Sequence, residues 1–257
     1  MARVKAIAHD ERLSLVDHLD ELRTRIIICG ITVVVALSVC FWQNDLALEI
    51  AEAPLPADAP PLITLGPAEA FTTSLTVSGY FAILLALPIL LYQLYAYVLP
   101  AFSDAERRTI TPLLLLAPLL FIGGVLFAYF VVMPPAIAFL TDFNDDVFNN
   151  QLRAREYYSF FATMMIALGL IFEIPIAILS ATRLGIVTPD QLAKNRRYAI
   201  LVIAILAAFL PSIDPVTLLL EIVPIVLLYE MSIIMARMIG SPAEEDLERD
   251  KTPVEET

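Results

Sequence analysis

The chain has 257 residues, of which 59% are hydrophobic and 17% are charged, with a mean hydropathy of +0.77 and a formal net charge of −12. That much apolar surface exceeds what the core of a soluble domain of this length can hide, so lipid must solvate part of it. The negative charge argues against nucleic acid as a partner, because phosphate binding requires a basic face. We therefore expect an all-α integral membrane protein in contact with the lipid bilayer.

The first 25 residues are rich in polar side chains and end in a stretch with helical periodicity. Four apolar side chains fall on one stripe of that stretch: Leu15, Leu19, Leu22 and Ile26. The stripe predicts an amphipathic helix at the membrane surface that runs into the first span. No small-residue cleavage site follows the first apolar run, so we expect no signal peptide here. Cys29 and Cys40 lie about 16 Å apart on such a helix, too far for a disulfide.

Runs without charged residues mark the spans, since a helix needs about 20 apolar residues to cross the hydrocarbon core. They predict six transmembrane helices, near residues 26–43, 72–99, 109–140, 157–183, 198–211 and 216–237. The fifth is short and ends in the turn 210–215, which contains two prolines, and Glu221 and Pro224 interrupt the sixth. We expect the last two helices to be short and to cross as an undersized hairpin; a re-entrant pair that never crosses is the alternative.

Lysine and arginine predict the orientation, because cytoplasmic segments carry an excess of both. Of the 16 basic residues, only Arg153 and Arg155 fall in segments that six spans place outside. Both termini are therefore expected in the cytoplasm. We expect one membrane domain over residues 1–239, with a cytoplasmic N-terminus over 1–25, followed by an acidic, disordered cytoplasmic tail over 240–257.

The first external segment, 43–69, contains no basic residue and several prolines: Pro54, Pro56, Pro60, Pro61 and Pro67. These prolines exclude a continuous helix, so we expect an extended cap along the outer surface. No internal repeat is visible, so the inverted-repeat plan of many secondary transporters is not indicated.

Catalytic chemistry is not indicated by any pattern in the chain. The two histidines, His9 and His18, both lie in the N-terminal segment. The sequence contains no nucleophile-elbow, zinc-protease or phosphate-loop motif and no Cys/His cluster with metal-ligand spacing. We expect no enzymatic activity, no catalytic residue, no metal site and no cofactor.

Two of the polar residues inside predicted spans are candidates for a role in contacts or function. Glu173, near the middle of the fourth span, costs several kcal/mol in hydrocarbon unless it is protonated, paired or exposed to water. Pro175 leaves the carbonyl of Ile171 without its helical donor, which makes this position locally polar. A neutral structural glutamic acid and a functional one both fit. Gln93, near the inner end of the second span, is a candidate for hydrogen bonding between helices.

Short motifs in one consistent order resemble those of the TatC family, the signal-peptide receptor of the twin-arginine translocase. They are HLDELRTR at 18–25, APL at 53–55, LYQLYAY at 91–97, PAF at 100–102, ERR at 106–108, AYFVV at 128–132, FEIP at 172–175 and YE at 229–230. Each motif is weak alone, but together they cover nearly the whole chain. The resemblance implies a curved wall of six helices rather than a closed bundle.

The resemblance also implies a receptor for signal peptides with two adjacent arginines. Glu21 and Glu106 match the family's two cytoplasmic carboxylates, and Tyr97 matches its aromatic position near them. Carboxylates suit this task because a guanidinium donates two parallel hydrogen bonds to one carboxylate, which an ammonium group cannot do. Simpler interpretations remain open: Glu21 has i,i+4 spacing to Arg25, and Glu106 has the spacing of a helix cap. Asp20 is a further candidate beside Glu21.

Further implications of the resemblance concern partners and location. Gln93 and Glu173 correspond to polar positions that contact TatA- and TatB-like single-span subunits, and Pro54 corresponds to a proline of the periplasmic cap. A homo-oligomeric receptor complex in the bacterial plasma membrane, driven by the proton-motive force, is implied as well. Two alternatives stay open: a proton-coupled secondary transporter of a small solute that uses Glu173, and a passive scaffold for other membrane helices.

Overall fold

The computed structural model describes residues 7–57, 59–98, 104–143, 151–183, 185–208 and 214–239, with the side chains of 7–17, 104–110 and 112–114 left out. These residues are almost entirely helical, with a single isolated β-bridge among them. The helices are α1 (Ile7–Trp42), α2 (Asn44–Glu52), α3 (Pro67–Val98), α4 (Asp104–Phe127), the π-helix η2 (Ala128–Val132), α5 (Met133–Asp142), α6 (Ala154–Ile171), α7 (Ile174–Arg183), α8 (Pro189–Lys194), α9 (Arg196–Ala208) and α10 (Pro215–Ile239).

Five helical segments of the described residues are long and apolar enough to cross a membrane: His18–Trp42, Pro67–Val98, Leu115–Asp142, Ala154–Arg183 and Pro215–Met238. The predicted fifth span corresponds to α9, whose 13 residues reach only about 20 Å. The shortness is confined to α9, because α10 has 25 residues. Six crossings therefore stay a prediction.

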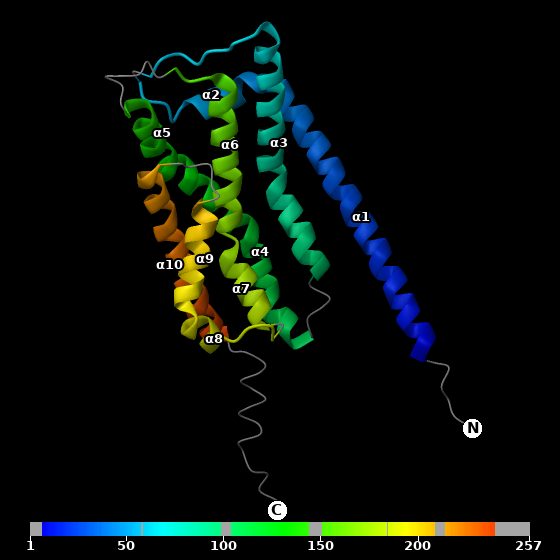
Figure 1. Cartoon of the computed structure of the whole chain (residues 1–257). Coiled ribbons are helices and arrows are strands. Elements are labelled where there is room, and N and C mark those ends of the chain that lie inside the picture. Colours follow the sequence, from blue (N-terminus) through cyan, green and yellow to red (C-terminus); the bar gives the residue numbers. More distant parts are fainter. Residues whose placement is uncertain are drawn as a thin grey trace, which may run out of the picture.

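The helices form an open wall, as predicted, and not a closed bundle (Figure 1). α1 packs against α3, which in turn packs against α4 and α6, while α10 packs against α7 and α9. α1 lies at one edge of the wall, and only 6% of the most apolar 18-residue stretch of His18–Trp42 is buried. Most of α1 therefore faces lipid, and its position depends on its contact with α3.

We call the two ends of the wall the lower end and the upper end, as drawn in Figure 1. The lower end carries the start of α1, the end of α3, the start of α4 and the short α8; the upper end carries α2 and the start of α6. Basic residues gather at the lower end on several helices, for example Arg25, Arg183, Lys194, Arg196 and Arg237. Arg153 and Arg155 lie at the upper end. The charge asymmetry in the sequence thus becomes an asymmetry between the two ends.

The cap at the upper end differs from the predicted extended segment, because its first part is the helix α2 (Figure 1). All of its prolines follow Glu52, so nothing prevents residues 44–52 from being helical. Three tyrosine hydroxyls hold the end of α2: Tyr129 donates to the carbonyl of Ile50 (3.0 Å), Tyr157 to the carbonyl of Ala51, and Tyr158 to the carboxylate of Glu52.

The extended part of the cap is fastened to the start of α6. The amide of Ile63 donates to the carbonyl of Leu152 (3.0 Å), and the amide of Ala154 donates back to Ile63 (2.9 Å). Arg153 between them donates from Nε to Glu69 at the start of α3 (2.7 Å), and this hydrogen bond raises the pKa of Arg153. Backbone and side-chain contacts together fix the cap across α3 and α6.

Prolines account for two irregular stretches inside the wall. The third long segment contains η2 directly before Pro134 and Pro135, which lack the N–H groups that a regular α-helix needs there. The fourth is interrupted between α6 and α7, two residues before Pro175, as the sequence indicates. The second interruption places Glu173 in a turn in the middle of the wall.

The crossing of α4 and α6 is close because two glycines face the opposite helix. A Cβ atom on Gly124 would lie 2.7 Å from the backbone oxygen of Leu168. A Cβ atom on Gly169 would lie 2.5 Å from the ring of Phe121, which is fully buried. Small residues at such crossings let membrane helices approach closely, so this contact fixes the centre of the wall.

Candidate functional site

The candidate site lies at the lower end, where Glu21 projects from α1. One carboxylate oxygen of Glu21, Oε1, accepts hydrogen bonds from Nε (3.0 Å) and Nη2 (2.6 Å) of Arg25. The pair predicted from the i,i+4 spacing is therefore confirmed. The Glu21 side chain is 35% exposed, so this ion pair stands at the edge of the wall and is open to solvent.

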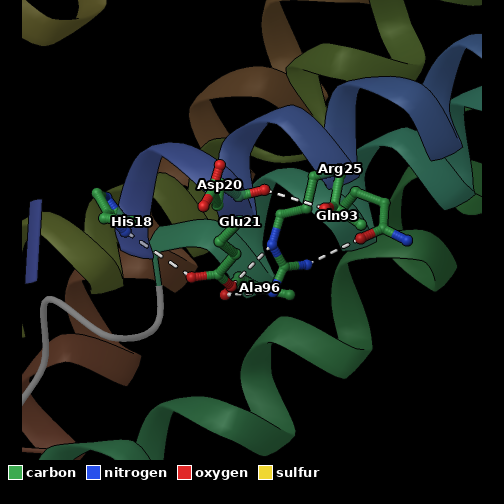
Figure 2. A network of polar contacts seen from close by, with 7 residues as sticks. His18, Asp20, Glu21, Arg25, Gln93 and Ala96 are labelled. Carbon is green, nitrogen blue, oxygen red and sulfur yellow. Dashed lines mark hydrogen bonds and ion pairs between the residues drawn. The ribbon is translucent and has the colours of Figure 1, made fainter. Parts of the chain in front are cut away.

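Arg25 also connects α1 to α3 (Figure 2). Its Nη1 donates to Oε1 of Gln93 (2.8 Å), and its Nη2 donates to the carbonyl of Ala96 (3.3 Å). Gln93 thus makes the contact between helices that the sequence predicts, and its partner is Arg25. The sequence predicts Arg25 as a partner of Glu21 but not of Gln93, because the periodicity of a helix does not show which helix lies beside it.

The second oxygen of Glu21 points toward an aromatic pair. Oε2 lies 3.8 Å from Nδ1 of His18, which is beyond hydrogen-bond distance. The His18 ring stacks on Tyr97 of α3, with the ring centroids 4.3 Å apart and the planes 10° from parallel. The structure therefore brings three predicted site residues together, namely Glu21, Gln93 and Tyr97. It adds Arg25 and His18 to them.

The other acidic candidates lie at the same end. Asp20 is exposed on α1 beside Glu21, and its backbone carbonyl accepts a hydrogen bond from the hydroxyl of Thr24 (3.0 Å). Glu106 falls in the first turn of α4, also at the lower end (Figure 1), and its side chain lies outside the described residues. Its distance from Glu21 therefore stays a prediction.

Glu173 lies apart from this network, in the turn between α6 and α7. It is only 6% exposed, and its Oε2 accepts a hydrogen bond from the hydroxyl of Tyr95 (3.1 Å). Gln93 and Glu173 are both expected to contact partner helices, but within this chain Gln93 accepts a hydrogen bond from Arg25 of α1 and Glu173 accepts one from Tyr95 of α3. Pro54 lies at the upper end, in the turn that follows α2.

Removing the Tyr95 hydroxyl tests the structural role of Glu173. We expect Tyr95→Phe to lower the free energy of unfolding by about 1 kcal/mol, because a buried acceptor loses its donor. Tyr92→Phe is the matched control, since Tyr92 is exposed on the same helix and should leave stability unchanged. Thermal melting of both variants in detergent measures the difference. Equal melting temperatures would contradict a structural role for this hydrogen bond.

Acidic residues in α10 and next to it have partners at both ends of the helix. Glu230 forms an ion pair with Arg196 of α9 (2.8 Å). Arg237 contacts Asp190 of α8 (3.2 Å). At the upper end, Asp214 caps α10 by accepting a hydrogen bond from the amide of Thr217 (2.7 Å). These contacts hold α8, α9 and α10 together.

Comparison with known proteins gives consistent matches over most of the chain. Residues 17–224 match the family described as "Sec-independent protein translocase protein (TatC)". A protein of that name from Carboxydothermus hydrogenoformans is 36% identical over 90% of this chain and 95% of its own length. A chloroplastic relative from Arabidopsis thaliana is 34% identical over 93% of this chain and 70% of its own.

A solved structure shows the same fold. The crystal structure of a twin-arginine translocase receptor, TatC, superposes with a TM-score of 0.73 and 35% sequence identity, covering 86% of this chain and 98% of that one. Sequence and fold therefore agree on one family.

Proposed function

The chain belongs to the TatC family of Sec-independent protein translocase proteins, and we propose on that premise that its lower end binds twin-arginine signal peptides. It is a multi-pass membrane protein and a core component of the twin-arginine translocase, where it acts with other subunits. The alternative of a proton-coupled transporter of a small solute finds no support among the related proteins.

The geometry of Glu21 supports this proposal. Its Oε1 already accepts two N–H groups of one guanidinium, that of Arg25, and its Oε2 lies outside hydrogen-bond distance of His18. A peptide arginine binds at Oε2, or replaces Arg25 on Oε1 while Gln93 and Ala96 retain Arg25. Glu106 receives the second arginine, and the stacked pair of His18 and Tyr97 offers a flat face to a guanidinium.

The two carboxylates alone contribute too little free energy to bind a peptide tightly. An exposed ion pair contributes about 0–1 kcal/mol, while micromolar affinity requires about 8 kcal/mol. Exchange of one arginine for another on Glu21 adds little net energy. The two carboxylates therefore determine which peptide binds, and further contacts determine how tightly it binds.

The proposal extends to the surroundings of the protein. The lower end faces the cytoplasm, because it carries most of the basic residues, and a bacterial plasma membrane is the expected location. TatA- and TatB-like single-span subunits assemble along the wall near Glu173 and α9, whose short length thins the bilayer. Further copies of this chain complete the receptor complex, and the proton-motive force drives transport.

The observation that carries the proposal is the half-exposed Glu21 carboxylate already engaged with a guanidinium. We expect the purified chain to bind a synthetic signal peptide with Arg-Arg about tenfold more tightly than the same peptide with Lys-Lys, since an ammonium group cannot donate two parallel hydrogen bonds. Fluorescence anisotropy in detergent measures both affinities. Equal affinities would show that the site does not select guanidinium groups.

A further inference from the structure

An apolar groove opens beside the Glu21 network, between α1 and α3. Its volume is about 420 Å³, within the range of roughly 300–1,000 Å³ that is typical of ligand pockets. The walls are almost wholly apolar and come mainly from Leu22, Ile26 and Cys29 of α1 and Leu87, Leu90 and Leu94 of α3. The polar exceptions, Arg25, Gln93 and Tyr97, are the residues that surround Glu21.

The position of the groove relative to Glu21 suggests its occupant. Signal peptides carry an apolar stretch of roughly 7–15 residues directly after a positively charged segment. From Leu87 to Tyr97 the groove follows α3 for about 15 Å, which is the length of roughly ten helical residues. A peptide whose arginines reach Glu21 has its next residues at the lower mouth of this groove.

We propose that the groove between α1 and α3 binds the apolar segment of the signal peptide whose arginines contact Glu21. The inference rests on the proposed function and deepens it. The protein and the peptide are complementary in the same order: the Glu21 carboxylate at the mouth suits the basic segment of the peptide, and the apolar groove beyond it suits the apolar segment. Because exposed ion pairs are weak, the groove supplies the additional contacts that hold the peptide.

The two cysteines of the chain provide a direct test. Both are half-buried on α1, but only Cys29 lines the groove. The Cys40→Ser variant keeps Cys29, and the Cys29→Ser variant keeps Cys40. Each full-length variant, in detergent, is mixed with an Arg-Arg signal peptide that carries one cysteine in its apolar segment, and disulfides are formed with copper phenanthroline and oxygen.

We expect the peptide to crosslink to Cys40→Ser at least tenfold more than to Cys29→Ser, and the yield to vary with the position of the peptide cysteine. Equal yields in the two variants, or none in either, would overturn the groove assignment. If Arg-Arg selectivity over Lys-Lys persists in that case, the proposed function stands without the groove. If the selectivity is absent as well, both fail.

Filling the groove gives an independent readout. Leu94 is 56% exposed and lines the groove, whereas Leu85 is 58% exposed on the same helix and does not line it. We expect Leu94→Trp to weaken binding of the complete signal peptide about tenfold and Leu85→Trp to leave it unchanged. A short peptide that ends after the two arginines should bind the unmodified protein, Leu94→Trp and Leu85→Trp equally. Equal effects of both tryptophans on the complete peptide would contradict the inference.

Discussion

Replacing Glu21 with arginine is expected to lower the affinity for a twin-arginine signal peptide about 100-fold and to stop export of a folded precursor. Placing like charges together costs several kcal/mol, and each 1.4 kcal/mol corresponds to about a factor of ten. The variant removes the acceptor of the peptide arginine and adds a cation in its place. Peptide binding by fluorescence anisotropy and export of a reporter protein in cells measure the two effects.

Two controls separate the site from general effects of charge. Glu49→Arg makes the same change on an exposed position of α2 at the upper end and should leave binding unchanged. Glu21→Gln keeps a carbonyl oxygen for Arg25 and should weaken binding only about tenfold, since a neutral acceptor forms the weaker hydrogen bond. A Glu21→Arg protein that still crosslinks normally to the signal peptide would refute the site assignment.

Replacing Gly124 with valine is expected to destabilise the protein by about 3 kcal/mol or more. The added side chain meets the backbone oxygen of Leu168, which cannot move without shifting α6. Gly123→Val is a close control, because it changes the neighbouring residue in the same way and a Cβ atom there has no atom within 4 Å. Thermal melting and gel filtration in detergent compare the two variants.

The difference between these variants distinguishes packing from helix propensity. Both exchange glycine for a β-branched residue in α4, so any common effect reflects the helix itself. Of the two α4 variants, Gly124→Val alone should lose the folded monomer. Gly169→Val in α6 should lose it as well, because its side chain meets the ring of Phe121. If Gly123→Val were equally damaging, the close crossing of α4 and α6 would not explain the result.

The sequence predicts the positions of the membrane helices well, because a helix surrounded by lipid must be built from a run of residues with few charges. Each charge-poor run of about 20 residues becomes a helix, and the short run near 198–211 becomes the 13-residue α9. Local rules also succeed: the spacing of Glu21 and Arg25 predicts their pair, and Pro175 predicts the break next to Glu173.

Contacts between distant segments are what the sequence leaves open. Gln93 lies 68 positions from Arg25, and only the packing of α1 on α3 brings them together. The same packing creates the groove, whose lining reads in sequence as ordinary lipid-facing residues. The prolines of segment 43–69 predict an extended cap, but they begin only at Pro54, and the residues before them form the helix α2.

The attachment of α2 has a consequence for how this region tolerates mutation. Tyr129 and Tyr157 donate to main-chain carbonyls, a group that every amino acid carries. Substitutions at Ile50 or Ala51 that fit the available space therefore keep these hydrogen bonds, while loss of either phenol removes one. Among related chains, the residues of α2 should therefore vary widely, while Tyr129 and Tyr157 should vary little.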